Sequence, residues 1–143
     1  MKADKILLIH GPNLNLLGTR EADVYGTESQ EQLFKFIKLS FPEIEFIFFQ
    51  CNHEGALIDT IHDKRDWADA IIINAGAFSH YSYAIRDAIK AVDIPAIEVH
   101  ISDIHNREDF RKKLVLSDVC IGTITGKGKQ GYLEAVKQLR NLQ

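Results

Sequence analysis

Five short apolar runs recur along the chain, and each is rich in isoleucine, valine or phenylalanine. Most of the runs are continuous rather than alternating, which is typical of strands that are buried on both faces of a parallel sheet. Segments with a helical spacing of apolar residues lie between them. The runs predict strands at 5–10, 44–51, 69–74, 95–100 and 118–123.

The intervening segments predict helices. Their apolar stripes fall within 33–41, 81–92 and 133–140. Helix starts are expected near Ser29, at Ser79–His80 and at Asn106, because serine and asparagine are good N-cap residues. Since no linker or internal repeat interrupts the alternation of strand and helix, we expect one α/β domain over residues 1–143.

Alternating strands and helices form right-handed crossovers that place helices on both faces of a sheet. Five strands in a chain of this length favour the flavodoxin-like order 2-1-3-4-5 over a barrel. In such sheets ligands bind beyond the carboxyl ends of the strands, at the switch point between strands 1 and 3. The functional residues are therefore expected at that edge of the sheet.

Composition excludes several classes of protein. The 143 residues are 45% hydrophobic and 26% charged, with a net charge of −3, so no nucleic-acid partner is expected. The apolar run near the N-terminus is too short for a signal peptide or a membrane span, which predicts a cytoplasmic protein without a membrane partner. Cys51 and Cys120 lie in apolar runs and are expected to be buried, reduced strand residues, without a disulfide scaffold or a zinc site.

Polar residues gather where strands 1, 3 and 4 end. The loop from 11 to 25 is long for a connection of this kind, which favours a lid or binding loop over an ordinary surface loop. Glu98 and His100 lie two apart on one strand and so point to the same face, where the carboxylate can orient the imidazole. A structural pair that caps the strand is the alternative. The polar residues at these ends are Asn13, Asn74, Glu98, His100 and Ser102.

Two arginines follow the fourth strand. Arg107 and Arg111 lie four apart and would share one face of the predicted helix, although solvated arginines are the usual case. His100, Asp103 and His105 match no familiar metal-site spacing, so no metal is expected. The polar residues at the strand ends and the two arginines together offer acid–base groups and anion-binding groups.

A glycine-rich stretch at 126–131 fits the pattern G-x-G-x-x-G. A dinucleotide site would also need a further strand and an acidic residue about 20 positions later, for which the sequence after it has no room. These glycines are expected to form the turn into the last helix.

Several long motifs give the chain a resemblance to the type II 3-dehydroquinate dehydratases. They are GPNLNLLGTRE with the Tyr-Gly pair at 25–26, QCNHEGALID, NAGAFSHYSYAIRDAI, PAIEVHISDIHNREDFR and QGY, which together run along nearly the whole chain. The resemblance implies a flavodoxin-like fold, no cofactor and no metal. It also implies a lyase that eliminates water, reversibly and with anti geometry, from 3-dehydroquinate to give 3-dehydroshikimate through an enolate.

The resemblance further implies a role for individual residues. Tyr25 would be the base that removes the proton next to the ketone, and Arg20 in the same loop would stabilise its phenolate. His100, held by Glu98, would donate a proton to the departing hydroxyl, and Asn13 would position a water that stabilises the enolate. Substrate contacts or lid closure are implied for Asn74, His80, Ile101, Ser102, Arg107 and Arg111.

The resemblance implies an assembly as well. The family forms trimers packed into dodecamers, and Asp87 would reach into the site of a neighbouring subunit. The same reaction serves the biosynthesis of chorismate and aromatic amino acids and the catabolism of quinate. The sequence does not separate these two uses.

A tyrosine base is chemically reasonable only with a cation beside it. Forming the anion of a tyrosine with an ordinary pKa of about 10 costs about 4 kcal/mol at pH 7. A guanidinium within reach lowers the pKa of an acid by about 1–3 units, so Arg20 makes Tyr25 a workable base.

The competing function is a non-catalytic, flavodoxin-like sensor of small anions. The presence of Tyr25, Arg20 and His100 argues against it. A receiver domain would need an acidic pair after the first strand, and a flavodoxin would need a hydroxyl-rich phosphate loop there. The sequence has Gly-Pro-Asn at that place.

Overall fold

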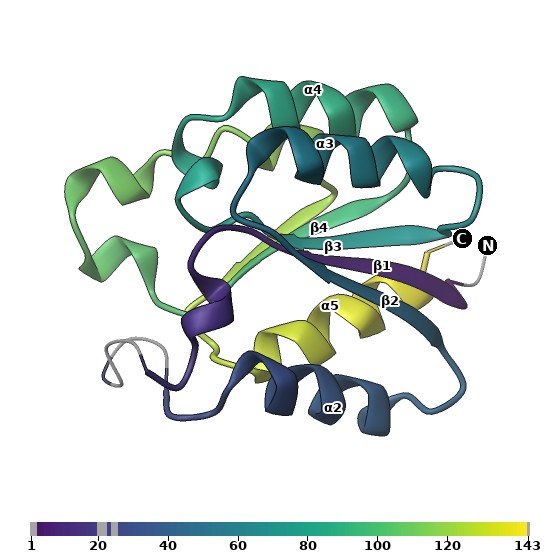
Figure 1. Ribbon diagram of the computed structural model, residues 1–143, viewed down its shortest axis with the longest axis horizontal. Helices are drawn as coiled ribbons and strands as arrows, with labels where there is room; N and C mark the ends of the chain where they lie inside the picture. Colours follow the sequence, from purple (N-terminus) through teal and green to yellow (C-terminus); the bar gives the residue numbers. More distant parts are fainter. Residues whose placement is uncertain (1–2, 20–22, 24–25, 143) are drawn as a thin grey trace.

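Five parallel strands form the centre of the molecule in the computed structural model, which describes residues 3–19, 23 and 26–142 (Figure 1). Their order is β2-β1-β3-β4-β5, which confirms the predicted topology. The strands are β1 (Lys5–His10), β2 (Glu45–Gln50), β3 (Ala70–Asn74), β4 (Ala96–His100) and β5 (Gly122–Thr125).

Helices cover both faces of this sheet. The pair α2 and α5 lies on one face and the pair α3 and α4 on the other (Figure 1). Ile6 and Leu8 of β1 pack toward the first pair, and Leu7 and Ile9 pack toward the second, which explains why the strand is apolar at successive positions. The helices are α2 (Gln30–Ser40), α3 (Glu54–Asp63), α4 (Tyr83–Val92) and α5 (Gln130–Arg140).

Two predicted helix boundaries are confirmed. Ser29 caps α2 in a capping box, where its hydroxyl accepts from the Gln32 amide at 3.1 Å and the Gln32 side chain accepts from the Ser29 amide at 2.8 Å. Gly126 and Gly128 both have positive φ angles in the turn between β5 and α5. The first part of the glycine-rich stretch, 126–129, is therefore a turn, as predicted, whereas Gly131 lies in the first turn of α5.

The loops after β1 and β3 lie against each other at the switch point. A Cβ on Gly11 would lie 2.2 Å from the carbonyl oxygen of Ala75, and the Gly11 amide donates to the Asn74 carbonyl at 2.8 Å. Gly76 has a φ of 61°, and a Cβ there would lie 3.0 Å from the carbonyl oxygen of Pro12. Only glycine permits this approach, which brings the residues after both strands together.

The predicted helix starts at Ser79–His80 and Asn106 are wrong. Gly76–His80 form a 3-10 turn, and α4 begins at Tyr83 because the Ser82 hydroxyl caps the Ile85 amide at 3.0 Å. After β4 there are two short 3-10 turns, η3 (Ile104–Asn106) and η4 (Asp109–Lys112). The Asp103 carboxylate accepts from the Asn106 side chain at 2.8 Å, so that side chain does not cap a helix.

The predicted fifth strand is displaced along the chain. The strand begins at Gly122, whereas Ser117–Val119 form a 3-10 turn, η5. Asp118 lies in this turn, outside the sheet, and pairs with Arg86 at 2.7 Å. The predicted burial of the two cysteines in strands is also wrong, since Cys51 and Cys120 are half-buried, free thiols that lie outside the strands.

No helix in the described part of the chain combines the length and the hydropathy that a membrane crossing requires.

Candidate active site

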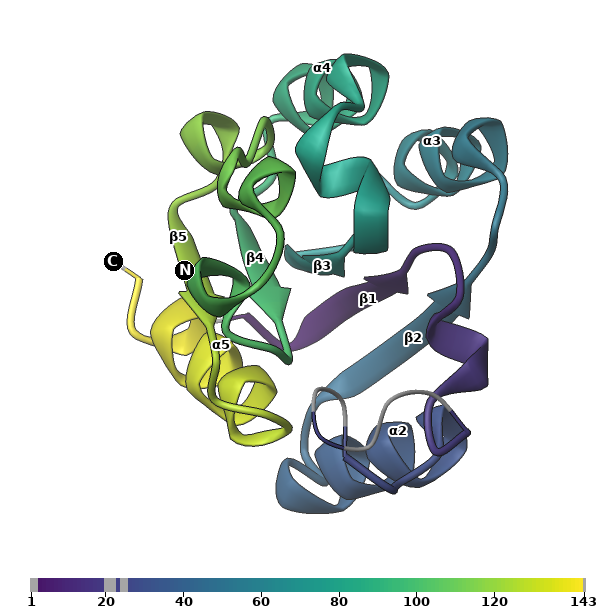
Figure 2. The same ribbon diagram turned by 90° about the vertical axis from the view of Figure 1, so that its left-hand side faces the viewer.

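A crevice of about 80 Å³ opens where β1, β3 and β4 end, at the predicted switch point. Figure 2 looks onto this end of the molecule, where the loops after the three strands converge. The predicted residues that line the crevice are Asn13, Asn74, His80, His100, Ile101, Ser102, Arg107 and Arg111. Most of the predicted substrate contacts, which are far apart in the sequence, therefore lie together in the structure.

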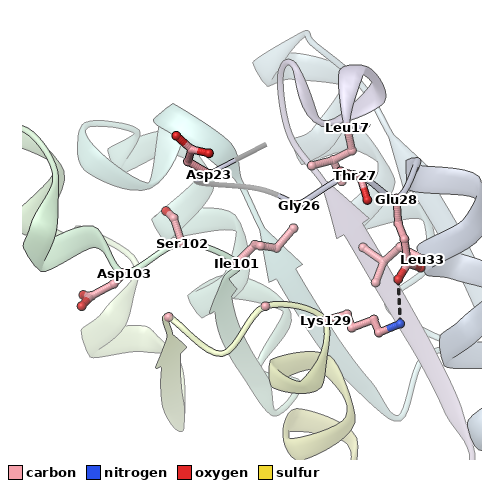
Figure 3. A pocket seen from close by; sticks show the side chains of 12 residues that line it. Leu17, Asp23, Gly26, Thr27, Glu28, Leu33, Ile101, Ser102, Asp103 and Lys129 are labelled. Atoms are coloured by element: carbon pink, nitrogen blue, oxygen red, sulfur yellow. Dashed lines mark hydrogen bonds and ion pairs between the residues drawn. The ribbon is translucent and has the colours of Figure 1, made fainter. Parts of the chain in front are cut away.

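A second and larger cavity of about 520 Å³ shares Ile101 and Ser102 with the crevice. Leu17 and Leu33 give it an apolar wall, and the Lys129–Glu28 ion pair, at 2.6 Å, closes one side (Figure 3). The two hollows together extend the space open to a ligand from the end of β4 toward α2.

His100 and Glu98 form a buried pair at the end of β4. The imidazole Nε2 lies 2.6 Å from Glu98 Oε2, and both side chains are almost completely buried. Because a carboxylate only accepts hydrogen bonds, Nε2 carries a proton. Nδ1 is then the ring atom that remains to exchange a proton with a ligand. The prediction that Glu98 and His100 lie side by side is confirmed.

Glu98 is held at both of its oxygens. Its Oε1 accepts from the Ser117 hydroxyl at 2.9 Å, and the Thr123 hydroxyl donates to Ser117 Oγ at 3.1 Å. Thr123 pairs with Glu98 across β4 and β5. The buried carboxylate is thus fully bonded, and it orients His100. Ser117 and Thr123 were not predicted, because the register between β4 and β5 brings Thr123 beside Glu98 and the turn η5 before β5 brings Ser117 there.

His80 faces the crevice as a neutral ring. Its Nδ1 donates to the carbonyl of Lys113 at 2.9 Å, which leaves Nε2 as an acceptor. Burial lowers the pKa of His80 below its ordinary value, and the nearby guanidinium of Arg111 lowers it further. His80 can therefore accept a hydrogen bond from a ligand hydroxyl.

Two cations, Arg107 and Arg111, also line the crevice. Nη1 of Arg107 donates to the Ser102 hydroxyl at 3.4 Å. Arg111 pairs with Glu108, and its guanidinium lies 4.9 Å from the centre of the Phe110 ring. The predicted sharing of one helix face is wrong, since the two arginines belong to separate segments. Both nonetheless line the crevice, where guanidinium groups favour an anionic ligand.

Two carboxamides line the crevice on the β1 and β3 sides. Asn13 adopts a left-handed backbone conformation with a φ of 71°, which asparagine tolerates. Its backbone N–H donates to Asn52 Oδ1 at 3.0 Å. Asn74 is bonded at both ends, by the Gly76 amide and by the Tyr132 hydroxyl. Tyr132 was not predicted as a site residue, since it entered only through the final QGY motif.

The remaining predicted residues lie away from the crevice or outside the described residues. Asp87 is exposed on α4 and pairs with Arg86 at 3.3 Å, and it does not line the crevice. Arg20 and Tyr25 belong to the part of the chain that the structure does not describe. Among the residues that are described, no group of three or more histidine, cysteine, aspartate or glutamate side chains is arranged to hold a metal ion.

The crevice combines a histidine backed by a carboxylate, a neutral imidazole acceptor, two guanidinium groups and two carboxamides. The guanidinium groups suit a ligand carboxylate, whereas the acceptor and the carboxamides suit hydroxyl and carbonyl groups. The His100–Glu98 pair adds a group that can give or take a proton. The arrangement therefore suits acid–base chemistry on a small, hydroxylated carboxylate.

A family model, two relatives and a solved structure that match this chain all indicate one family. A model for "Dehydroquinase class II" matches residues 4–140. A 3-dehydroquinate dehydratase of Caldicellulosiruptor saccharolyticus is 52% identical over 141 residues, which cover 96% of this chain and 97% of that protein. A catabolic 3-dehydroquinase of Botryotinia fuckeliana is 51% identical over 142 residues, with 96% and 92% covered. The crystal structure of a type II dehydroquinase from Butyrivibrio crossotus superposes with a TM-score of 0.92 at 48% identity, with 96% and 97% of the two chains covered.

Proposed function

The chain belongs to the class II dehydroquinase family, and we propose that its crevice removes water from 3-dehydroquinate with Tyr25 as the base and His100 as the acid. The chain is thus a 3-dehydroquinate dehydratase of type II, a lyase of the shikimate pathway. The observation that carries the assignment of the acid is the buried pair of His100 and Glu98, which places an imidazole nitrogen in the crevice.

The proposed reaction has two proton transfers. The phenolate of Tyr25 takes the proton next to the ketone, and the electron pair moves onto the carbonyl oxygen to form an enolate. Asn13, directly or through a water, donates to that oxygen, since a developing oxyanion is stabilised by an oriented donor. When the enolate collapses, the carbon–oxygen bond breaks and His100 protonates the hydroxide that leaves as water. A return of the proton from Tyr25 to His100 through solvent completes the cycle.

The geometry suggests how a substrate of this kind would be held. Its carboxylate would meet backbone groups of Ile101 and Ser102, close to the guanidinium of Arg107. Its hydroxyl groups would reach Nε2 of His80 and the side chain of Arg111. The neutral state of His80 supports this arrangement, because its Nε2 can accept only while it is unprotonated.

Replacement of Arg20 by alanine tests the base. Without the cation the pKa of Tyr25 would rise by about 1–3 units, so we expect kcat at pH 7 to fall roughly 10- to 1000-fold. Because the base acts when deprotonated, the acidic limb of the kcat/KM profile would move to higher pH by the same number of units. Steady-state kinetics between pH 6 and 10, with Arg20→Lys as the charge-retaining control, measures both effects. Near wild-type turnover in Arg20→Ala would contradict the phenolate.

We also propose that the protein assembles from trimers into a dodecamer through a surface that includes Asp87. Tyr83 lies one helical turn before Asp87 on α4, and Tyr81 lies just before this helix. They are 57% and 59% exposed, which is unusual for aromatic side chains and is typical of an interface. Sedimentation velocity would show a single dodecameric species. A monomer at micromolar concentration would contradict the proposal.

A further inference from the structure

Four side chains form a continuous series of hydrogen bonds beneath the crevice. His10 Nδ1 lies 2.7 Å from Gln30 Oε1, and His10 Nε2 lies 2.8 Å from the Tyr132 hydroxyl. The same hydroxyl lies 3.1 Å from Nδ2 of Asn74. His10, Tyr132 and Asn74 are buried, and the four residues come from β1, the start of α2, β3 and α5. Of the four, only Asn74 lines the crevice.

The Gln30 carboxamide oxygen that faces His10 sets the direction of each hydrogen bond in this series. Burial lowers the pKa of His10 to about 4, so the ring is neutral and has one donor and one acceptor. The Gln30 oxygen accepts, so the proton lies on Nδ1, and Nε2 accepts from the Tyr132 hydroxyl. Burial also raises the pKa of Tyr132, so its hydroxyl keeps that proton. The lone pairs of Tyr132 are then left to accept from Asn74.

The Asn74 carboxamide consequently has one orientation. Its Nδ2 donates to Tyr132, and its Oδ1 accepts from the Gly76 amide at 3.2 Å. A flipped amide would set Oδ1 against an oxygen that has no proton to offer, and Nδ2 against another N–H group. Each mismatch would leave a buried polar group without a hydrogen-bond partner, which strongly disfavours the flipped orientation.

We propose that Tyr132 and His10 are positioning residues, which fix the Asn74 carboxamide so that the second Nδ2 proton is directed at a hydroxyl of the substrate. This inference rests on the proposed function, because it takes Asn74 to be a substrate contact. Tyr132 and His10 themselves do not line the crevice. They act on substrate binding only through Asn74, and this separates their role from that of a contact residue.

A double-mutant cycle tests the proposal. In Tyr132→Phe the ring remains and the hydroxyl is lost, so we expect KM to rise roughly 3- to 10-fold, the size of one hydrogen bond, with a smaller change in kcat. Asn74→Ala should raise KM by at least as much. In the Asn74→Ala background, Tyr132→Phe should change KM less than about twofold, because residues that act through one contact are not additive. Equal effects in both backgrounds, or no effect in either, would overturn the proposal and leave the dehydratase assignment intact.

A matched control separates positioning from general loss of stability. Thr60 on α3 also donates a hydroxyl hydrogen bond, to the Ala56 carbonyl at 2.8 Å, and it does not line the crevice. Thr60→Val should leave both kcat and KM within about twofold of wild type, the scatter expected of a substitution that touches no site residue. A rise in KM equal to that of Tyr132→Phe would show that loss of a hydroxyl is enough by itself, and it would overturn the proposal.

A second measurement does not depend on activity or on the folding of Tyr132→Phe. In wild-type protein, the proton that Asn74 Nδ2 donates to Tyr132 should exchange with solvent at least tenfold more slowly than the side-chain amide of exposed Asn141, because a buried hydrogen bond must open first. Equal exchange rates would overturn the proposal. A wild-type protein without dehydratase activity would instead overturn the proposed function, and the exchange rate would still decide whether the hydrogen bonds hold the amide.

Discussion

Replacement of His100 by glutamine is expected to lower kcat roughly 10²- to 10⁴-fold, the usual contribution of a general acid, with little change in KM. Glutamine keeps a donor for Glu98 and fills a similar volume, but it cannot deliver a proton to the leaving hydroxide. The loss should therefore fall on the chemical step. Single-turnover kinetics with 3-dehydroquinate would measure it directly.

The variant Ser117→Ala tests the orientation of His100 separately from its role as the proton donor. In Ser117→Ala the imidazole remains, but Oε1 of Glu98 loses the hydroxyl that lies 2.9 Å away. We expect a smaller loss of kcat, roughly tenfold, because one buried hydrogen bond to a charged group is removed. Added to His100→Gln, the same change should have almost no further effect, since groups that act as a unit are not additive. If His100→Gln kept more than a tenth of the wild-type kcat, His100 would not be the acid.

Replacement of Gly11 by alanine is expected to lower the free energy of unfolding by about 3 kcal/mol or more. The new Cβ would lie 2.2 Å from the Ala75 carbonyl oxygen, which belongs to the backbone of a buried loop and cannot turn away. Overpacking against a rigid neighbour costs about 3 kcal/mol or more, a large part of the stability of a small domain. Urea denaturation followed by circular dichroism would show the loss.

Gly55 supplies the control for this experiment. It lies in α3, and a Cβ there would meet no atom within 4 Å. Gly55→Ala should leave the free energy of unfolding unchanged or raise it by up to about 1 kcal/mol, because alanine favours a helix. If Gly11→Ala and wild type unfolded at the same urea concentration, the close contact between the loops after β1 and β3 would be disproved.

The sheet was predictable because burial on both faces leaves a direct mark on the sequence. β1 needs apolar residues at successive positions, and Ile6 to Ile9 supply them. The period of two along a strand similarly places Glu98 beside His100. The fifth strand was misplaced because Cys120 and Ile121 are as apolar as strand residues, yet Ile121 is more than half exposed and the pairing begins at Gly122.

The polar contacts behind the site were not predictable from local pattern. In the sequence, His10 is the polar residue at the end of an apolar run, and Tyr132 is one aromatic residue on the buried side of a helix. Their contact joins positions 122 residues apart, which no periodicity encodes. The turns after β4 were misjudged for a related reason, because the Asp103 side chain bonds the backbone of His105 and the side chain of Asn106 and so replaces the N-cap that a helix would need.

The most direct test of the proposed dehydration is ultraviolet absorbance on mixing the purified protein with 3-dehydroquinate in the presence of a metal chelator, alongside Tyr25→Phe. We expect the absorbance of the enone product to rise with the wild-type protein and to stay flat with the variant. A flat trace from well-folded wild-type protein would contradict the dehydratase function. An equal rise from both proteins would contradict the tyrosine base.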